Sequence, residues 1–220
     1  MKVLVTNFNG NPNIGLYLFA TEEYCIAGLD VPIASVHEIK KALKVPVYHL
    51  NLAGTSMVGV FCAGNSNKLL VPDLLFEKEL SKLDKLKIDY EVIKTYLTAL
   101  GNNILCNDHG ALVNEEFSDA EKKAIKEALG VPLKTGKLAE LDTVGSLGVL
   151  NKNGGLVHTD ATANEIQHIK DLLKINCETG TVNMGNPFLK SGIVCNNKGV
   201  VIGDKSGGPE LAYIAELLGF

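Results

Sequence analysis

The sequence predicts an α/β fold in which five copies of one ββαβ unit, each about 44 residues long, close into a pseudo-symmetric propeller. Three sets of recurring residues predict it. A leucine opens a short apolar motif at steps of 43 to 45 residues, at Leu43, Leu86, Leu129, Leu173 and Leu218. Glycines recur at steps of 42 to 44 residues, at Gly15, Gly59, Gly101 and Gly145. An Asn-x-x-Gly turn followed by two apolar residues recurs at Asn107, Asn151 and Asn196. Such a period indicates a unit that buries its apolar face only against its neighbours.

The strands of one unit are clearest in the third repeat. The apolar stretch from Leu97 to Cys106 predicts a first strand, and Asn107-Asp-His-Gly110 predicts a tight turn. Ala111-Leu-Val113 then begins a second strand, and Val131-Pro-Leu133 opens a third strand beyond a helix. The order of elements in the unit is therefore ββαβ.

The helices have their own start signals. Ser118-x-x-Glu121 and Thr162-x-x-Glu165 are capping boxes, in which two side chains satisfy free N–H groups at the start of a helix. Pro209 fits the first turn of the fifth helix, where a backbone N–H would have no helical partner. Apolar residues recur at helical spacing after each start, so we expect each helix to bury one face.

The two chain ends together complete the fifth unit. That unit reaches Phe220 before its third strand begins. The residues before Gly15 contain an apolar strand pattern at the spacing that third strands keep from the next recurring glycine. A strand within residues 1–9, including Met1, is therefore expected to complete the fifth unit. This closure removes the exposed sheet edges of an open array, and it makes residues 1–220 a single domain.

Composition argues against a nucleic-acid-binding surface. The 21 basic residues are all lysines, and 25 acidic residues give a net charge of −4. Arginine supplies the planar group that grips phosphates and guanine edges, and this chain has none. Aromatic residues make up 6% and tryptophan is absent, so base stacking is not expected either. We expect contacts mainly with protein and little direct contact with RNA.

Hydropathy gives no sign of a membrane segment. No apolar run approaches the roughly 20 residues that a spanning helix needs. The beginning of the chain, Met-Lys-Val-Leu-Val-Thr-Asn, is too short and polar for a signal peptide. We therefore expect a cytoplasmic protein.

The cysteines and histidines do not form a catalytic or metal-binding pattern. The sequence contains no C-x-x-C, and the five cysteines occupy positions that hold Leu, Ile or Val in other repeats. A cysteine in such a position is a small core residue. The five histidines show no metal-ligand spacing. The sequence thus predicts no catalytic residue, no cofactor and no metal.

Several longer motifs resemble one family. They are Ala99-Leu-Gly-Asn-x-x-x-Cys106-Asn-Asp-x-x-Ala111-Leu-Val113, Gly154-Gly-Leu-Val-His158, Gly180-Thr-Val-Asn-x-Gly185 and Gly64-Asn-x-x-x-Leu-Leu-Val-Pro72. With these motifs the chain resembles, over essentially its whole length, the family of translation initiation factor 6, the archaeal and eukaryotic ribosome anti-association factor. The chain ends soon after the fifth helix, without the tail of eukaryotic members, so it resembles an archaeal form.

The resemblance implies a fold and a function. It implies the pentein fold, in which five α/β units surround a pseudo-five-fold axis. It also implies binding to the large ribosomal subunit, mainly through a basic ribosomal protein near the sarcin-ricin loop. Joining of the small subunit would then be blocked sterically, by a monomer and without catalysis, and a role in large-subunit maturation is a further expectation. An acidic, arginine-free chain suits a basic docking partner.

Ring symmetry places the recurring glycines at one end of the propeller, and we expect that end to bind the subunit. The segment from Asn183 to Asn186 is expected to supply the fifth position. The candidate ribosome-binding residues are Gly15, Gly59, Gly101, Asn102, Gly145, Asn183, Gly185 and Asn186. For the glycines, tight turns and close backbone approach are the alternative explanation, and for Gly59 and Gly145 it is equally good. Asn102 is the better functional candidate, because the fold does not require a polar side chain there.

Two other classes of function stay open at the level of sequence. Pentein enzymes that act on guanidino groups, such as arginine deiminases, use a cysteine nucleophile with a histidine partner, and Cys195 and His158 are the residues available here. The position of Cys195 in a core strand argues against this, because a reactive thiolate needs an exposed, electropositive setting. The third class is a binding module that uses the central channel for a metabolite.

Overall fold

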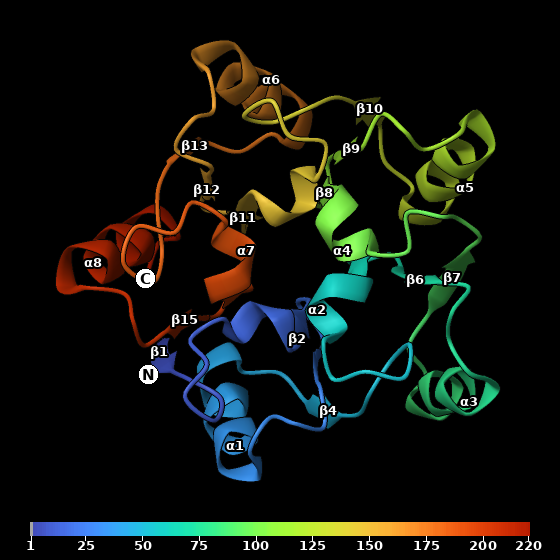
Figure 1. The fold of residues 1–220 in the computed structure, drawn as a ribbon, viewed down its shortest axis with the longest axis horizontal. Helices are drawn as coiled ribbons and strands as arrows, with labels where there is room; N and C mark the ends of the chain where they lie inside the picture. The colour runs from blue at the N-terminus through green and yellow to red at the C-terminus, as the bar shows by residue number, and fades with distance from the viewer. Residues whose placement is uncertain (1) are drawn as a thin grey trace.

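The computed structural model describes residues 2–220 and consists of five three-stranded sheets around a central axis (Figure 1). The first unit contains η1 (Ile14–Leu16), β2 (Leu18–Ala20), β3 (Cys25–Ala27), α1 (Ile33–Leu43) and β4 (Val47–His49). The second contains α2 (Val58–Phe61), β5 (Ala63–Gly64), β6 (Leu69–Pro72), α3 (Glu77–Leu86) and β7 (Tyr90–Ile93). The third contains α4 (Leu100–Asn103), β8 (Ile104–Cys106), β9 (Ala111–Val113), α5 (Asp119–Leu129) and β10 (Leu133–Thr135). The fourth contains η2 (Val144–Ser146), β11 (Gly148–Leu150), β12 (Gly155–Val157), α6 (Ala163–Leu173) and β13 (Cys177–Thr179). The fifth contains α7 (Leu189–Gly192), β14 (Ile193–Cys195), β15 (Val200–Gly203), α8 (Gly208–Leu217) and β1 (Val3–Thr6).

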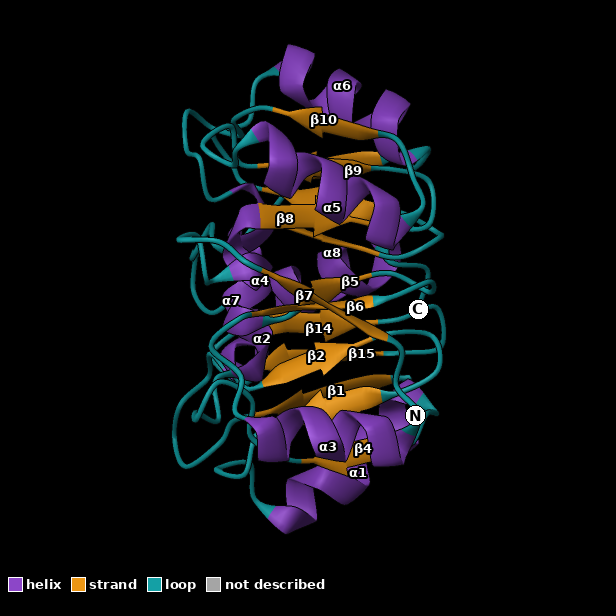
Figure 2. Cartoon of the chain, turned by 90° about the vertical axis from the view of Figure 1, so that its right-hand side faces the viewer, coloured by secondary structure: helices purple, strands orange, loops and turns teal. Residues whose placement is uncertain are grey.

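Every unit has the same topology. Its first two strands pair antiparallel, and its third strand pairs in parallel with the second. The long helix connects the two parallel strands and lies on the outside of the ring, whereas the short helices surround the axis (Figure 1). Figure 2 shows the short helices at one end of the ring, and the turns joining the antiparallel strands lie at the other. These two ends are called the short-helix end and the hairpin end.

The ring closes through the N-terminal strand, as predicted. Strand β1 pairs in parallel with β15, with Val3 opposite Val200 and Thr6 opposite Gly203. The ordered strand is shorter than the predicted segment 1–9, because Phe8 already pairs with Asn11 in a tight turn. Met1 lies outside the described residues. The predicted closed five-fold α/β propeller is confirmed.

The predicted strand from Leu97 to Cys106 is wrong in its first half. Residues 100–103 form the short helix α4, and only residues 104–106 form strand β8. Leu100 and Ile104 are both buried, so an apolar run that reads as one strand here passes through two elements in the core. The capping boxes at Ser118 and Thr162 are confirmed, with each hydroxyl accepting the N–H of the glutamate three residues on.

The apolar core is divided into five clusters, one beneath each long helix. Each cluster contains buried residues from the inner face of that helix, among them one at the same place in every helix. These residues are Ile39, Leu83, Ile125, Ile169 and Ile214. The helical stripes predicted from sequence therefore pack against the sheets, and the axis itself is left to the first strands and the short helices.

Asparagines at the hairpin end fasten each unit to the next. In four hairpins the asparagine oxygen accepts N–H groups of its own turn, and its Nδ2 donates to a carbonyl at the C-terminal end of the next unit's long helix. The four pairs, with N···O distances of 3.0, 2.8, 2.9 and 2.9 Å, are Asn65–Leu129, Asn107–Leu173, Asn151–Leu218 and Asn196–Leu43. One amide thus folds its own turn and ties two units together.

The junction between the first and second units lacks this tie. Thr21 stands at the asparagine position, and its hydroxyl accepts the N–H groups of Glu23 and Tyr24. Among the described residues no side chain donates to the carbonyl of Leu86, which ends α3. A cavity of about 210 Å³ lies there, between the Thr21 hairpin and the end of α3. Leu86 is partly exposed, although its four counterparts are fully buried.

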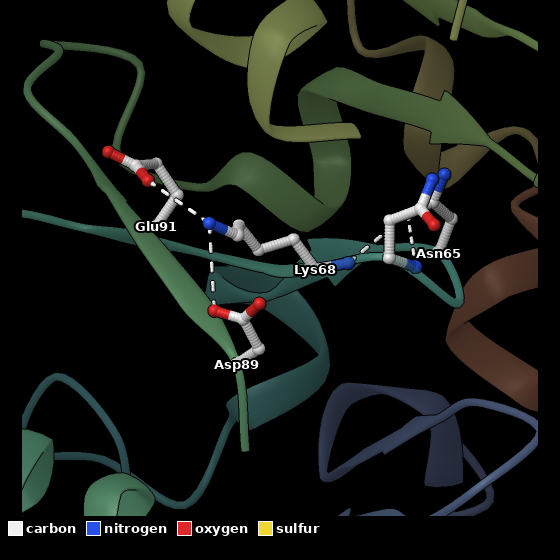
Figure 3. A network of polar contacts seen from close by, with 5 residues as sticks. Asn65, Lys68, Asp89 and Glu91 are labelled. Carbon is white, nitrogen blue, oxygen red and sulfur yellow. Dashed lines mark hydrogen bonds and ion pairs between the residues drawn. The ribbon is translucent and has the colours of Figure 1, made fainter. Parts of the chain in front are cut away.

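Charged side chains line the same junction. Figure 3 shows Lys68 between two carboxylates of the second unit, with Nζ 3.6 Å from Asp89 and 3.8 Å from Glu91. The Asn65 carboxamide oxygen accepts the backbone N–H of Lys68 at 3.3 Å. These contacts stay within the second unit, so they do not replace the missing tie to the first.

Candidate docking surface at the short-helix end

Four of the recurring glycines lie in the short helices around the axis. Gly15, Gly59, Gly101 and Gly145 belong to η1, α2, α4 and η2. A Cβ at any of them would overlap a carbonyl oxygen of the preceding short helix, in the order Lys190, Gly15, Gly59 and Gly101. Glycine is therefore required for the close approach of neighbouring units, and a large side chain at Gly15 would disturb the ring itself.

The expectation that Asn183 to Asn186 supply the fifth position is wrong. Lys190 occupies it, because it follows buried Leu189 in α7 as Gly15 follows buried Ile14 in η1. The segment forms the turn before the short helix, closed by pairing of Val182 with Asn186. Equivalent turns pair Phe8 with Asn11, Leu52 with Thr55 and Leu138 with Leu141, so the turn in the fifth unit is one residue longer. The residue at the fifth position is therefore a lysine and not a glycine.

The asparagines of this turn have structural partners. Asn183 donates from Nδ2 to the carbonyl of Pro12 at 3.0 Å. Asn186 accepts the N–H of Phe188 at 3.0 Å. The N–H of Gly185 donates to the Glu210 carboxylate at 2.8 Å. These bonds hold the turn in place.

The turn lowers the pKa of the Glu210 carboxyl. Burial acts to raise the pKa of its carboxyl, but hydrogen bonds from the Thr181 hydroxyl and from the N–H groups of Gly185, Met184 and Gly207 outweigh it and lower the pKa. The ionised carboxylate therefore holds the turn and the start of α8 together.

The structure brings Asn102 to a shallow cavity on the axis. The cavity has a volume of about 280 Å³ and is lined by Gly15, Leu16, Gly59, Val60, Asn102, Thr143, Ser146, Phe188, Lys190 and Ser191. Among the described residues, no hydrogen bond engages the Asn102 side chain. Its amide has no hydrogen-bond partner in the described chain, whereas Gly101 and Gly145 lie beneath this surface in the packed ring.

Exposed apolar side chains gather at the short-helix end. Most of the large apolar residues that are exposed lie in the turns before the short helices, in the loops between second strands and long helices, or at the first residue of α1: Leu29, Ile33, Met57, Leu74, Phe76, Tyr96, Leu141, Met184 and Phe188. Figure 2 shows those turns and loops projecting from that end. Tyr96 is fully exposed and Met184 is 81% exposed. Because exposed apolar side chains cost free energy in water, their concentration on one end makes that end the candidate docking surface.

The hairpin end is polar by contrast. Its axial cavity, of about 150 Å³, is lined by asparagines of the hairpins together with Glu22, Asp108, Lys152 and Lys174. The asparagines there are occupied in joining units. The two ends of the ring therefore differ in chemistry, although they are built from the same five repeats.

The cysteines behave mostly as predicted. Cys25, Cys62 and Cys177 are buried, whereas Cys106 and Cys195 are partly buried and line the axial cavities. Burial raises the pKa of Cys106 to about 11 and that of Cys195 to about 12. These thiols therefore stay protonated at neutral pH, which is the opposite of what a nucleophilic cysteine needs.

His158 does not pair with Cys195. The backbone N–H of His158 bonds to Leu147 at the short-helix end of β11, and its ring packs edge-on against Phe188 at 5.5 Å. The sulfur of Cys195 contacts the carbonyl of Leu150, at the other end of β11, at 3.5 Å. The geometry therefore gives no support to a cysteine–histidine catalytic pair.

Across residues 2–220, no three His, Cys, Asp or Glu side chains come together in a way that could hold a metal ion. None of the helices described for this stretch is both long and apolar enough to cross a bilayer.

The closed ring of five ββαβ units around a pseudo-five-fold axis defines the molecule as a pentein. Within that class, a model of the eIF-6 family matches residues 3–217, so the chain belongs to the eIF-6 family.

Curated relatives agree with this assignment. "Translation initiation factor 6" of Pyrococcus furiosus is 46% identical, with 100% of each chain covered. The protein of the same name from Thermococcus kodakarensis is 45% identical over 100% of this chain and 99% of its own, and that from Saccharolobus solfataricus is 41% identical over 96% of each. A solved structure titled as a putative peptidyl-arginine deiminase is 10% identical, with a TM-score of 0.41 over 71% of this chain and 64% of that chain. A similarity of that size says nothing about activity.

Proposed function

We propose that this protein is a translation initiation factor that binds the large ribosomal subunit through its short-helix end and sterically prevents joining of the small subunit. The observation that carries the proposal is the concentration of exposed apolar side chains at that end, in a member of the eIF-6 family. Relatives named translation initiation factor 6 share its full length. A role of the same contact in large-subunit maturation belongs to the proposal.

The proposed docking partner is a basic ribosomal protein near the sarcin-ricin loop. The chain carries a net charge of −4 and has no arginine, so a basic protein is a better electrostatic match than RNA phosphates. Tyr96, Met184 and Phe188 supply apolar and aromatic contact area, and Asn102 supplies a free amide at the centre. Aromatic residues and methionine are enriched in protein–protein interfaces.

Occlusion is a sufficient mechanism. A stable protein interface buries roughly 800 Å² on each partner. A factor that binds the face used by the small subunit excludes it as long as the factor stays bound, and no bond needs to be made or broken. We propose that the factor acts as a monomer in the cytoplasm.

Co-sedimentation with separated ribosomal subunits tests the proposal. The wild type should sediment with the large subunit alone and should reduce the fraction of joined ribosomes. The double variant Tyr96→Asn and Met184→Asn removes two exposed apolar side chains of the short-helix end and should weaken binding at unchanged Tm. Asn102→Lys should also weaken it, by placing a charge at the centre of the contact.

Tyr213→Asn is the matched control, because Tyr213 is an exposed aromatic residue on the outer helix α8. It should bind like the wild type. Absence of wild-type binding to the large subunit would refute the proposed function. Equal loss in the control would refute the choice of surface.

A further inference from the structure

Lysines from three separate segments meet at the hairpin end, where the fifth and first units join. Helix α1 packs against β1 and β15 at this junction (Figure 1). The Nδ2 of Asn196 bonds the carbonyl of Leu43 at 2.9 Å, and the N–H of Val200 bonds the carbonyl of Lys2 at 2.8 Å. The fold thus gathers the end of α1, the residue before β1 and the β14–β15 hairpin. Together they carry the five lysines that we call the basic patch: Lys2, Lys40, Lys41, Lys44 and Lys198.

Most of the positive charge of the basic patch is not compensated. All five lysines are exposed. Lys41 pairs with Glu38 at 2.7 Å, whereas none of the ion pairs found among residues 2–220 includes the other four. The Nζ of Lys198 donates to the backbone carbonyl of Glu22 at 2.6 Å, and the carboxylate of Glu22 accepts the N–H of Asn197 at 2.8 Å. The lysines therefore outnumber the carboxylates that these contacts bring to them, Glu22 and Glu38.

The ends of the other long helices do not repeat this excess. Helix α8 has no basic residue in its last turn. In the last turns of α3, α5 and α6 a single lysine has an acidic neighbour: Lys85 with Asp84, Lys126 with Glu127 and Lys170 with Asp171. The last turn of α1 instead holds two lysines and no acidic residue. Because the five units share one fold, the fold itself does not require the basic patch.

Lys44 also stands at a position that favours glycine. Its φ of 54° and ψ of 39° lie in the left-handed region, and α5 ends with Gly130 in the same conformation. The left-handed conformation costs a lysine free energy, and the attraction of its charge to the C-terminal end of the helix dipole returns a similar amount. The stability of the fold therefore gives little preference for lysine at this position.

We propose that the basic patch is a docking surface for an acidic segment of a protein partner. Clustered ammonium groups attract carboxylates, and charge complementarity of this kind favours both encounter and orientation. The patch is compact, and Glu22 and Glu23 of the first hairpin border it on one side. The chain has no arginine, and among the described residues the exposed aromatic side chains lie in other segments. A nucleic acid would need a longer track of phosphate contacts, arginine or stacking platforms, so a short acidic protein segment is the better match.

Labelled deca-glutamate is the probe for this surface in the isolated protein. It should bind saturably at low ionic strength, and its affinity should fall with added salt because exposed charges are screened. The double variant Lys40→Gln and Lys44→Gln should weaken binding about three- to tenfold, as expected from the loss of two exposed charge pairs. The control Lys94→Gln and Lys205→Gln changes the net charge equally, but both exposed lysines lie at the short-helix end. It should bind the peptide like the wild type.

A glycine variant separates docking from the stability of the helix end. Lys44→Gly relieves the left-handed conformation, so its Tm should stay unchanged or rise while its affinity for the peptide falls. Lys174 ends α6 with a φ of 55° and lies outside the basic patch. Lys174→Gly should therefore change the Tm by the same amount and leave the affinity unchanged. If Lys44→Gly lowers the Tm and binds the peptide like the wild type, Lys44 serves the helix end and the proposal fails.

Three other results would overturn the proposal: no saturable peptide binding, an equal loss in the Lys94 and Lys205 control, or tighter binding of a uridine oligonucleotide of equal charge. None of these measurements needs a ribosomal subunit, so their outcome is independent of the proposed function. Where the proposed function holds as well, the peptide and the large subunit should bind together, because the basic patch and the proposed contact lie at opposite ends of the ring. Competition between them would place the peptide at the short-helix end and would also contradict the proposal.

Discussion

Replacing Thr21 by asparagine should add the hydrogen bond between units that is missing at the junction of the first and second units. The four equivalent asparagines each donate Nδ2 to a carbonyl at the C-terminal end of the next long helix, and Asn65, Asn151 and Asn196 also reach a second carbonyl. The introduced asparagine should bond the carbonyl of Leu86 in the same way. A net contribution of about 1 kcal/mol per hydrogen bond gives a gain of about 1–2 kcal/mol. For a chain of this length that corresponds to a rise in Tm of about 2–8 °C.

Thermal unfolding and hydrogen exchange measure this effect. Besides the higher Tm, amides near the end of α3 and at Ile88 should exchange more slowly in Thr21→Asn. Thr21→Ser keeps the hydroxyl that folds the hairpin, so its Tm should not rise. The reverse change, Asn151→Thr, should lower the Tm because the carbonyl of Asn196 loses its side-chain donor and that of Leu218 keeps only the Nδ2 of Asn153. If Asn151→Thr lowers the Tm and Thr21→Asn leaves it unchanged, the reasoning about the first junction fails.

Four further predictions concern the axis, the fifth unit and the thiols. Gly59→Ala should cost about 1–3 kcal/mol in thermal unfolding because its Cβ would overlap the carbonyls of Gly15 and Leu18, whereas Gly208→Ala, at the open start of α8, should be neutral or slightly stabilising; equal effects would contradict the packing argument. The pKa of the Glu210 carboxyl is lowered in the folded state, so the stability that this carboxylate contributes is complete above the unfolded pKa of 4.5 and is lost as the pH falls through the lower folded value. In denaturant titrations Glu210→Gln should therefore lose less stability than the wild type over that acid range. Burial lowers the pKa of Lys190 to about 8, so the unfolded state binds more protons than the folded state between pH 8 and 10.5. The free energy of unfolding of the wild type relative to Lys190→Gln should therefore increase across that window. A difference in unfolding free energy that does not change with pH would show that Lys190 is not buried. Burial raises the pKa of Cys25, Cys62 and Cys195 to about 12, so a thiol reagent at pH 8 should label them slowly in the native protein and rapidly after unfolding, whereas rapid labelling of native Cys195 would favour a guanidino-modifying activity.

Much of the architecture was predictable because the repeats carry local signals. The recurring leucines, capping boxes and hairpin turns indicated the elements and their order, and the spacing before Gly15 correctly joined β1 to the fifth unit. The error at residues 97–106 arose because an apolar run does not show by itself where a buried helical turn ends and a strand begins. Among the site residues, the sequence singled out Asn102, and the structure leaves its side chain free of hydrogen bonds within the described chain.

By itself, the sequence determined the five-fold repeat, the closed ring and the placement of most cysteines in the core, because these follow from periodicity along the chain. Only the tertiary structure decided which residues meet across the axis. In the fifth unit Lys190, and not a glycine, lies at the position that faces the other four short helices. Thr21 folds its own hairpin as well as an asparagine does, and only the position of Leu86 shows that the tie is missing. Contacts between units depend on three-dimensional distance, which periodicity along the chain does not contain.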